Sequence, residues 1–261
     1  AYLGGGGVGG GHHIIKLTRE GSSLSFEELP FSFSNSVSAM AISPLDYSRW
    51  YVLTSGGQFY RSTDAGESWA LTFYGGPDGH YFYGSTILPS KVDSDVVYIG
   101  GSGYSSPPVY MSTNNGQSFS RMDEGLPNTL VYRLDSTEDS YLLFAATEAG
   151  PYVYVDHEAQ WYDIAGLGAP DQTYWSLEYI PELLTARFGT YGRGIWDFVL
   201  SGDYNVLYGD LNNDTIINIQ DIIVMINYAI SNGYIVQGDL NDDGLVNIQD
   251  IVLLVNIVLG N

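Results

Sequence analysis

The chain contains no cysteine and little positive charge. Its 261 residues include 9 Lys and Arg against 30 Asp and Glu, for a formal net charge of −21 at pH 7. This charge argues against binding to nucleic acid, where Lys and Arg must neutralise phosphate, and against docking on an anionic membrane. Without cysteine, disulfides, thiol nucleophiles and cysteine-ligated zinc or iron–sulfur sites are excluded.

Long apolar runs and a leader peptide are missing as well. No run reaches the ~18 to 20 residues that cross a bilayer, which argues against membrane insertion. The sequence opens at Ala1 without a secretory leader, which predicts a processed chain or a fragment. With 44% apolar and 14% aromatic residues, the composition is that of a folded protein. We therefore expect a folded, acidic, secreted or cell-surface protein.

Charge divides the chain in two. All nine Lys and Arg lie between Lys16 and Arg193, whereas residues 202–261 contain eight Asp and no Lys, Arg, His or Trp. Such a change in composition marks a domain boundary. We predict a first domain over 1–200, a linker over 201–205 and a second domain over 206–261.

The first domain has the pattern of an all-β fold. Short runs rich in Val, Ile, Tyr and Phe alternate with clusters of Gly, Ser, Pro and Asp, without a helical period. Many evenly spaced strands predict a sandwich, a barrel or a propeller. The clearest predicted strands are 50–54, 58–62, 96–100, 109–112, 141–145 and 152–155.

An internal repeat favours the propeller. Residues 60–69 (YRSTDAGESW) recur 50 residues later at 110–119 (YMSTNNGQSF). In each copy the side chain of Asp64 or Asn114 can bond to following backbone N–H groups, and Gly66 or Gly116 can take a positive φ. We interpret the motif as a structural turn.

This turn resembles the Asp-box of bacterial neuraminidase repeats, which occurs in sialidases, sortilin-like domains and xyloglucan-degrading propellers. Residues 188–196 are similar to the closing blade of sortilin-like bacterial propellers. The resemblance implies a β-propeller of which about four blades are visible, with the Asp-boxes away from the ligand face. Either the N-terminal strands complete a small ring, or the chain is the C-terminal part of a larger propeller, which we favour.

Two 12-residue loops of equal pattern lie 29 residues apart in the second domain. Each has oxygen-bearing side chains at positions 1, 3, 5, 9 and 12, which is the pattern of a calcium loop. Position 7 would donate a backbone carbonyl and turn its side chain to the core. The predicted ligands are Asp210, Asn212, Asp214, Ile216, Asn218 and Asp221 in the first loop, and Asp239, Asn241, Asp243, Leu245, Asn247 and Asp250 in the second.

The two loops differ at position 6, which is Thr215 in the first and Gly244 in the second. The backbone conformation there costs a β-branched residue about 1–3 kcal/mol. We predict Ca²⁺ at both sites, bound more weakly at the first.

Each loop leads into an apolar segment, 222–230 or 251–259, which we predict to be a helix. Two loop–helix units with Asp at position 12 resemble a type I dockerin, which implies a cohesin-like partner and a role in extracellular polysaccharide processing. Positions 10 and 11, which help dockerins to choose their cohesin, are Ile-Gln in both copies. The predicted partner-binding residues are therefore Ile219, Gln220, Ile248 and Gln249, although the apolar helix faces could instead pack on the propeller.

No motif secures an active site. A glycosidase needs two carboxylates roughly 5 to 9.5 Å apart, and sequence cannot pair the candidates, which are Asp78, Asp93, Asp95, Glu178 and Glu182. The best ligand-face segment is 75–84, where Tyr81 and Tyr83 could stack on a sugar beside His80, or equally be buried in a blade connection. We predict a non-catalytic, carbohydrate- or protein-binding propeller that a calcium-dependent dockerin anchors to a cohesin-bearing assembly. The alternative is the C-terminal part of a xyloglucanase-like or sialidase-like glycoside hydrolase.

Overall fold

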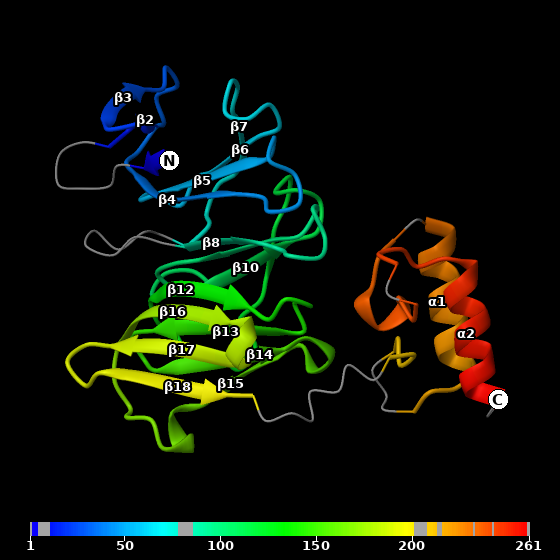
Figure 1. The fold of residues 1–261 in the computed structure, drawn as a ribbon. Coiled ribbons are helices and arrows are strands. Elements are labelled where there is room, and N and C mark those ends of the chain that lie inside the picture. Colours follow the sequence, from blue (N-terminus) through cyan, green and yellow to red (C-terminus); the bar gives the residue numbers. More distant parts are fainter. Residues whose placement is uncertain are drawn as a thin grey trace. The chain divides into compact units, whose positions relative to one another are not determined.

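The structure is a computed structural model that describes residues 2–4, 11–77, 86–200, 208–212, 216–231, 233–241 and 243–259. The chain divides into two compact units, Ala1–Val199 and Leu200–Asn261. The described part of the first unit is mainly β, and the second contains two α-helices (Figure 1).

Five small antiparallel sheets make up the described part of the first unit, and in each of them strands adjacent in sequence are paired. The first sheet contains β1 (Tyr2–Gly4), β2 (Ile14–Glu20) and β3 (Ser23–Glu28). The second contains β4 (Val37–Ile42), β5 (Trp50–Thr54), β6 (Phe59–Ser62) and β7 (Ala70–Phe73). The third contains β8 (Thr86–Pro89), β9 (Val97–Gly100), β10 (Val109–Ser112) and β11 (Ser120–Arg121).

The last two sheets follow the same plan, with short 3₁₀ helices in their connections. The fourth sheet contains β12 (Val131–Ser136), β13 (Leu142–Thr147), β14 (Pro151–Val155) and β15 (Gln160–Asp163). The fifth contains β16 (Tyr174–Ile180), β17 (Thr185–Thr190) and β18 (Ile195–Val199). The 3₁₀ helices are η1 (Asp156–Glu158), η2 (Ala165–Leu167) and η3 (Pro181–Leu183).

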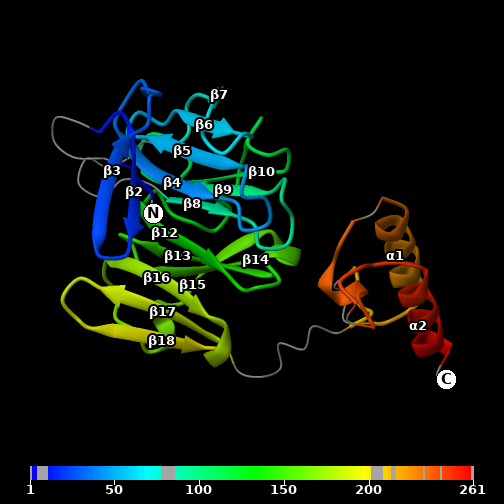
Figure 2. The same cartoon turned by 45° about the horizontal axis from the view of Figure 1, so that its top comes forward.

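Successive sheets meet through their first strands. Strand β1 contacts β4, β4 contacts β8, β8 contacts β12, and β12 contacts β16. Figures 1 and 2 show the sheets following one another like the blades of a propeller, each beginning with such an inner strand. The prediction of a mainly β chain with propeller-like blades is confirmed. The N-terminal hairpin of β2 and β3 is joined by β1, which pairs with β2.

Apolar side chains from neighbouring sheets pack together and form the core. Tyr51 and Phe59 of the second sheet pack with Ile99 of the third, and Val109 of the third packs with Trp161 of the fourth. Full burial of such a side chain contributes on the order of 1.5–3 kcal/mol. This packing holds neighbouring sheets against one another.

Three inner strands carry a β-bulge at the same place, one residue after the strand begins. Their pairing register shifts there in β4, β12 and β16. A bulge re-aims the side chain that it carries. The bulged residues are Ser38, Tyr132 and Trp175.

The second unit is built around α1 (Ile219–Ser231) and α2 (Ile248–Leu259), which contact each other. Met225 and Leu254 are fully buried in its small core, together with Leu211 and Val246. One further 3₁₀ helix, η4 (Val236–Gly238), precedes the second predicted calcium loop. Within the described residues, neither helix is long and apolar enough to cross a membrane.

Candidate functional site

The second predicted calcium loop, 239–250, folds around two buried carboxylates. Asp239 and Asp250 are 4% and 0% exposed. Asp239 accepts the backbone N–H of Asp243 at 3.0 Å and that of Gly244 at 2.8 Å. Gly244 has a φ of 81°, a conformation that glycine adopts without steric cost. Position 6 of this loop therefore has the left-handed backbone that the sequence pattern requires.

Asp250, at position 12, joins the start of the loop to the start of α2. One of its oxygens accepts the N–H of Leu240 at 2.9 Å and of Asn241 at 3.3 Å, and the other accepts the N–H of Asn247 at 2.9 Å. The side chain of Asn247 in turn accepts the N–H of Gln249 at 2.8 Å. This reciprocal arrangement is a capping box, which stabilises the first turn of the helix.

The first loop repeats this arrangement around Asp221, which is also fully buried. Asp221 accepts the N–H of Leu211 at 2.9 Å, of Asn212 at 3.2 Å and of Asn218 at 2.8 Å. Asn218 accepts the N–H of Gln220 at 2.7 Å. The two loops thus share one hydrogen-bonding scheme as well as one sequence pattern.

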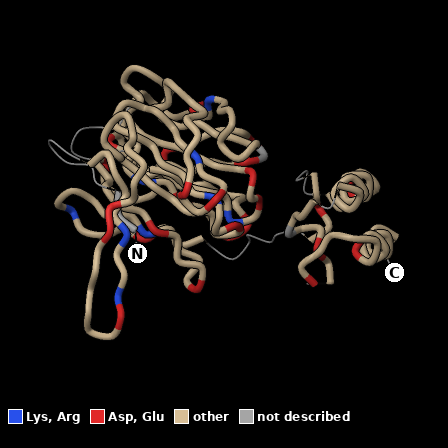
Figure 3. The backbone as a smooth tube through the Cα atoms, turned by 90° about the horizontal axis from the view of Figure 1, so that it is seen from above, with Lys and Arg blue, Asp and Glu red and all other residues tan. Residues whose placement is uncertain are grey.

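The oxygen donors of the two loops fit Ca²⁺. The set consists of carboxylate, amide and backbone carbonyl oxygens, which suit a hard cation. Each loop buries two carboxylates, and residues 200–261 contain no Lys, Arg or His that could compensate them; Figure 3 shows Lys and Arg only in the first unit. A bound dication would neutralise this otherwise costly charge. The buried aspartates are Asp210, Asp221, Asp239 and Asp250.

Position 7 of both loops differs from expectation, and part of the predicted ligand set lies outside the described residues. Ile216 and Leu245, at position 7, were expected to turn into the core, but both are exposed. A position that offers its carbonyl to the loop centre points its side chain outward. Residues 213–215 and 242, among them the predicted ligand Asp214, lie outside the described residues. In the described part, no three Asp, Glu or His side chains form a metal-binding cluster.

The predicted partner-binding positions lie in the first turn of each helix. Ile219 and Ile248 are 67% and 68% exposed, and Gln220 and Gln249 are exposed beside them. Further exposed apolar residues continue along each helix, so each helix keeps an apolar stripe that the small core does not cover. The stripes contain Ile223, Ile226 and Ile230 in α1, and Val252, Leu253, Ile257 and Leu259 in α2.

The first Asp-box is a closed hydrogen-bonded turn between β6 and β7. Ser62 Oγ donates to Asp64 at 2.6 Å, and Ser68 donates to Asp64 through its N–H at 2.9 Å and its hydroxyl at 2.5 Å. These bonds, that of Ser62 first, lower the pKa of Asp64 to about 2. Gly66, with a φ of 86°, leaves no room for a Cβ, which would lie 2.8 Å from the Trp50 ring.

The second Asp-box, between β10 and β11, is the same turn with an amide. Asn114 accepts the hydroxyl of Ser112 at 2.9 Å and the N–H of Ser118 at 2.9 Å. Gly116 rests on Phe59 of the preceding sheet. The boxes follow β6 and β10, which run parallel to β4 and β8, the inner strands of their sheets. The boxes therefore lie at the end of the sheets where the inner strands end, whereas the bulges lie where inner strands begin. The side chains of the boxes are used within the turns, which agrees with the structural interpretation.

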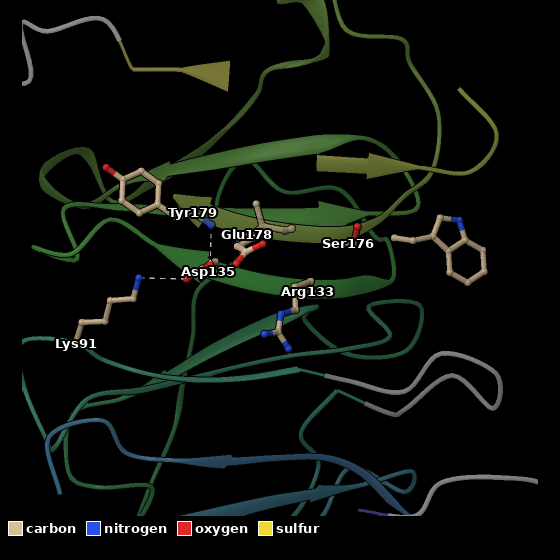
Figure 4. A pocket seen from close by; sticks show the side chains of 8 residues that line it. Lys91, Arg133, Asp135, Ser176, Glu178 and Tyr179 are labelled. Carbon is tan, nitrogen blue, oxygen red and sulfur yellow. Dashed lines mark hydrogen bonds and ion pairs between the residues drawn. The ribbon is translucent and has the colours of Figure 1, made fainter. Parts of the chain in front are cut away.

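A pocket of about 640 Å³ opens over the inner strands of the fourth and fifth sheets. In Figure 4, Arg133 and Asp135 project from β12, and Ser176 and Glu178 project from the adjacent β16. Sequence reasoning missed this site apart from Glu178, because the site forms only when two sheets meet. The lining residues are Lys91, Arg133, Asp135, Trp175, Ser176, Leu177, Glu178 and Tyr179.

Asp135 holds three sheets together at the wall of the pocket. Its carboxylate accepts the N–H of Tyr179 at 2.8 Å and pairs with the Lys91 ammonium at 3.4 Å. The Asp135 and Lys91 side chains are only 18% and 23% exposed. Lys91 follows β8, so this contact joins the third, fourth and fifth sheets.

Among the described residues, the other predicted acidic candidates do not line this pocket. Asp78, His80, Tyr81 and Tyr83 lie outside the described residues. Asp95, in the connection from β8 to β9, pairs with Arg49 at 2.5 Å, and Asp93 lies in the same connection. Glu182 belongs to η3, beyond the end of β16. Glu178 is thus the one member of that set among the pocket-lining residues.

Comparisons with known proteins relate the chain to propeller enzymes at the level of fold. No protein-family model and no curated protein matches the chain. The GH74 enzyme of Niastella koreensis is 20% identical, with a TM-score of 0.55 over 72% of this chain and 32% of its own. The GH74 xyloglucanase of Xanthomonas campestris is 15% identical, with a TM-score of 0.53 over 72% of this chain and 32% of its own.

An ancestral GH74 enzyme is similar as well, with 17% identity and a TM-score of 0.55 over 78% of this chain and 31% of its own. The chain therefore spans about a third of the length of these neighbours. At such identities the likeness concerns the fold, which is a propeller-like succession of small antiparallel sheets.

Proposed function

We propose that the chain serves extracellular polysaccharide processing, with a propeller that binds glycan and a second unit that is a calcium-dependent docking module of the dockerin type. The observation that carries the proposal is the open pocket across the inner strands of two adjacent sheets, in a fold that resembles GH74 enzymes. Open pockets with a few convergent polar groups are the usual binding sites of such folds.

The docking part of the proposal is supported by the two loops. In the second loop, Ca²⁺ would be held by the side chains of Asp239, Asn241, Asp243, Asn247 and Asp250 and by the carbonyl of Leu245. The ion would supply positive charge among buried carboxylates, while the capping boxes prepare each helix to start at its loop. The exposed apolar stripes of α1 and α2 would form the surface for a cohesin-like partner.

Two measurements on the full chain test the proposal. Calorimetric titration with Ca²⁺ is expected to show two sites, and affinity electrophoresis in gels containing single polysaccharides is expected to show retardation by at least one glycan. Asp250→Asn should remove the second site and leave glycan binding unchanged. Absence of Ca²⁺ binding would overturn the docking part, and absence of retardation by every glycan would overturn the binding part.

We expect weaker Ca²⁺ binding at the first site because of position 6. In the second loop this position is Gly244, with a φ of 81°, and in the first it is Thr215. A non-glycine residue in that conformation costs about 1–2 kcal/mol, or about tenfold in affinity per 1.4 kcal/mol. We expect Thr215→Gly to strengthen the first site by about tenfold, and Gly244→Thr to weaken the second by a similar factor. Equal affinities at the two sites of the unaltered chain would contradict this prediction.

A second candidate function is a glycoside hydrolase part, because the neighbours include a GH74 xyloglucanase. Glu178 would be the acid of this chain that faces the glycan. Release of reducing ends from xyloglucan, abolished in Glu178→Gln, would favour this function. Binding without release would favour a non-catalytic propeller.

A further inference from the structure

We infer that Tyr191 and Trp175, backed by Tyr132, form a sugar-stacking platform beside the pocket, and that it takes neutral pyranose rings. This inference rests on the proposed glycan binding and gives it a place and a sugar class. It is drawn from ring geometry, exposure and the polar groups beside the rings.

The three rings form a continuous pile that runs across two sheets. Tyr132 and Trp175 are stacked, with ring centroids 4.9 Å apart and planes 20° apart. Tyr191, in the turn after β17, lies against Trp175 with centroids 5.5 Å apart and planes 33° apart. Tyr191 is nevertheless 74% exposed. A ring that touches one neighbour and stays so exposed offers its other face to a ligand.

The bulges explain why the side chains of Trp175 and Tyr132 do not point into the core. In β16 the buried residues Tyr174, Leu177 and Tyr179 follow one another at intervals of three and then two, whereas a regular strand would bury every second residue and turn residue 175 into the core. Tyr174 is fully buried in the core, whereas Trp175 occupies the bulge and lines the pocket. Tyr132 occupies the same position in β12. Two neighbouring sheets thus bring one bulged aromatic residue each into the same stack, and Trp175 of the fifth sheet lines the pocket.

Charged side chains beside the pile remain available for hydroxyl groups. Arg133 and Glu178 are exposed, and within the described residues neither side chain makes a hydrogen bond or salt bridge. Glu178 lies opposite Arg187 of β17, whose positive charge is near its carboxylate. Asp135 and Lys91, in contrast, are committed to the contact between sheets. A guanidinium and a carboxylate can bond to donor and acceptor hydroxyls of the same sugar.

These groups select the chemistry of the ligand. A gluco-configured pyranose carries its hydroxyls at the ring edge, so its C–H faces can stack on an aromatic ring while its hydroxyls reach Arg133 and Glu178. A polyanionic glycan would be repelled by a chain whose net charge is −21. We therefore assign neutral polysaccharide built of pyranose rings as the ligand class.

The experiment measures the affinity of the full chain for xyloglucan and hydroxyethyl cellulose, with polygalacturonate as the acidic glycan. Tyr191→Ala should weaken neutral-glycan binding by about tenfold, the size expected for one lost stacking contact, and Trp175→Ala should weaken it further. Tyr47→Ala is the matched control, because Tyr47 is 78% exposed but lies in the connection from β4 to β5, at the opposite end of the inner strands. Circular dichroism and thermal midpoints check that each variant is folded.

The outcomes separate this inference from the proposed function. If the unaltered chain binds neutral glycan and Tyr191→Ala and Trp175→Ala bind equally well, the platform is overturned and glycan binding stands. If Tyr47→Ala loses as much affinity as Tyr191→Ala, the platform is overturned too. Preference for polygalacturonate would overturn the ligand class, and no binding to any glycan would overturn both proposals.

Discussion

At the scale of single residues, Asp64 is expected to make the stability of the first Asp-box depend on pH. Its pKa of about 2 lies below the ordinary value of 3.8 because Ser62 and Ser68 donate to its carboxylate. A carboxyl group whose pKa is lower in the folded state contributes stability above its unfolded pKa and loses it as pH falls. We expect this contribution to disappear between pH of about 4 and about 2.

The second box supplies the matched variant. Asp64→Asn places the same amide here as Asn114 and should keep the turn, so its thermal midpoint should fall less as the pH is lowered. Asp64→Ala should lower the thermal midpoint at every pH. Thermal midpoints at a series of pH values between 5 and 2 measure the difference. A midpoint of Asp64→Asn that falls as steeply as that of the unaltered chain would contradict the assignment.

Gly66 is the residue of the first box that tolerates no side chain. A Cβ there would combine a φ of 86° with a contact of 2.8 Å to Trp50. We expect Gly66→Ala to lower the free energy of unfolding by about 2 kcal/mol or more. Gly21 is the control, since its φ is 60° but nothing lies within 4 Å of a Cβ. Urea unfolding should show a clearly smaller loss for Gly21→Ala; equal losses would exclude the contact as the cause.

At the scale of the elements, Asp135 ties β12 to β16 and to the residue after β8. Asp135→Ala removes the acceptor of the Tyr179 N–H and a charge partner of Lys91, and should cost about 2 kcal/mol. Asp135→Asn keeps an acceptor and should cost about 1 kcal/mol or less. The control is Asp197→Asn, which breaks an exposed pair within one sheet and should change stability by at most about 0.5 kcal/mol. If urea unfolding showed equal losses of free energy for Asp135→Ala and Asp197→Asn, the contact of Asp135 between sheets would not be a stabilising one.

The elements also show what sequence alone could predict. The strands 50–54 and 109–112 match β5 and β10, because short, nearly continuous apolar runs between turn signals define both ends. The helices were predicted to begin at 222 and 251, three residues late. Loop positions 10 to 12 form the first helical turn, and Asn218 and Asn247 cap it, which a ligand pattern does not reveal.

The pocket could not be predicted in the same way. Its walls come from β12 and β16, which are more than 40 residues apart, and its aromatic wall depends on bulges that shift the register by one residue. A local signal does exist in the spacing of Tyr174, Leu177 and Tyr179, because an interval of three residues followed by one of two does not fit the two-residue period of a regular strand.

At the scale of the whole molecule, the two units are expected to respond separately to Ca²⁺. The second unit has a core of only a few apolar residues and an excess of Asp, so removal of Ca²⁺ by a chelator should lower its melting transition and leave that of the propeller unchanged. Calorimetry of the full chain should resolve two transitions, one of which moves with Ca²⁺. Sodium chloride serves as the control for charge screening. A single transition that ignores the chelator, or recovery by salt alone, would contradict specific binding.

The bulge that recurs at Ser38, Tyr132 and Trp175 has a consequence for how such a molecule can diversify. The bulged residue stands outside the register of the ladder, so its identity is decoupled from strand pairing and from the core. Duplication of a sheet in a gene copies this position together with the framework, and later substitution can alter it alone. The serine of the second sheet and the aromatic residues of the fourth and fifth occupy equivalent positions in their sheets. Substitution at this position can therefore change the side chain presented beside the inner strands, sheet by sheet, while strand pairing is kept.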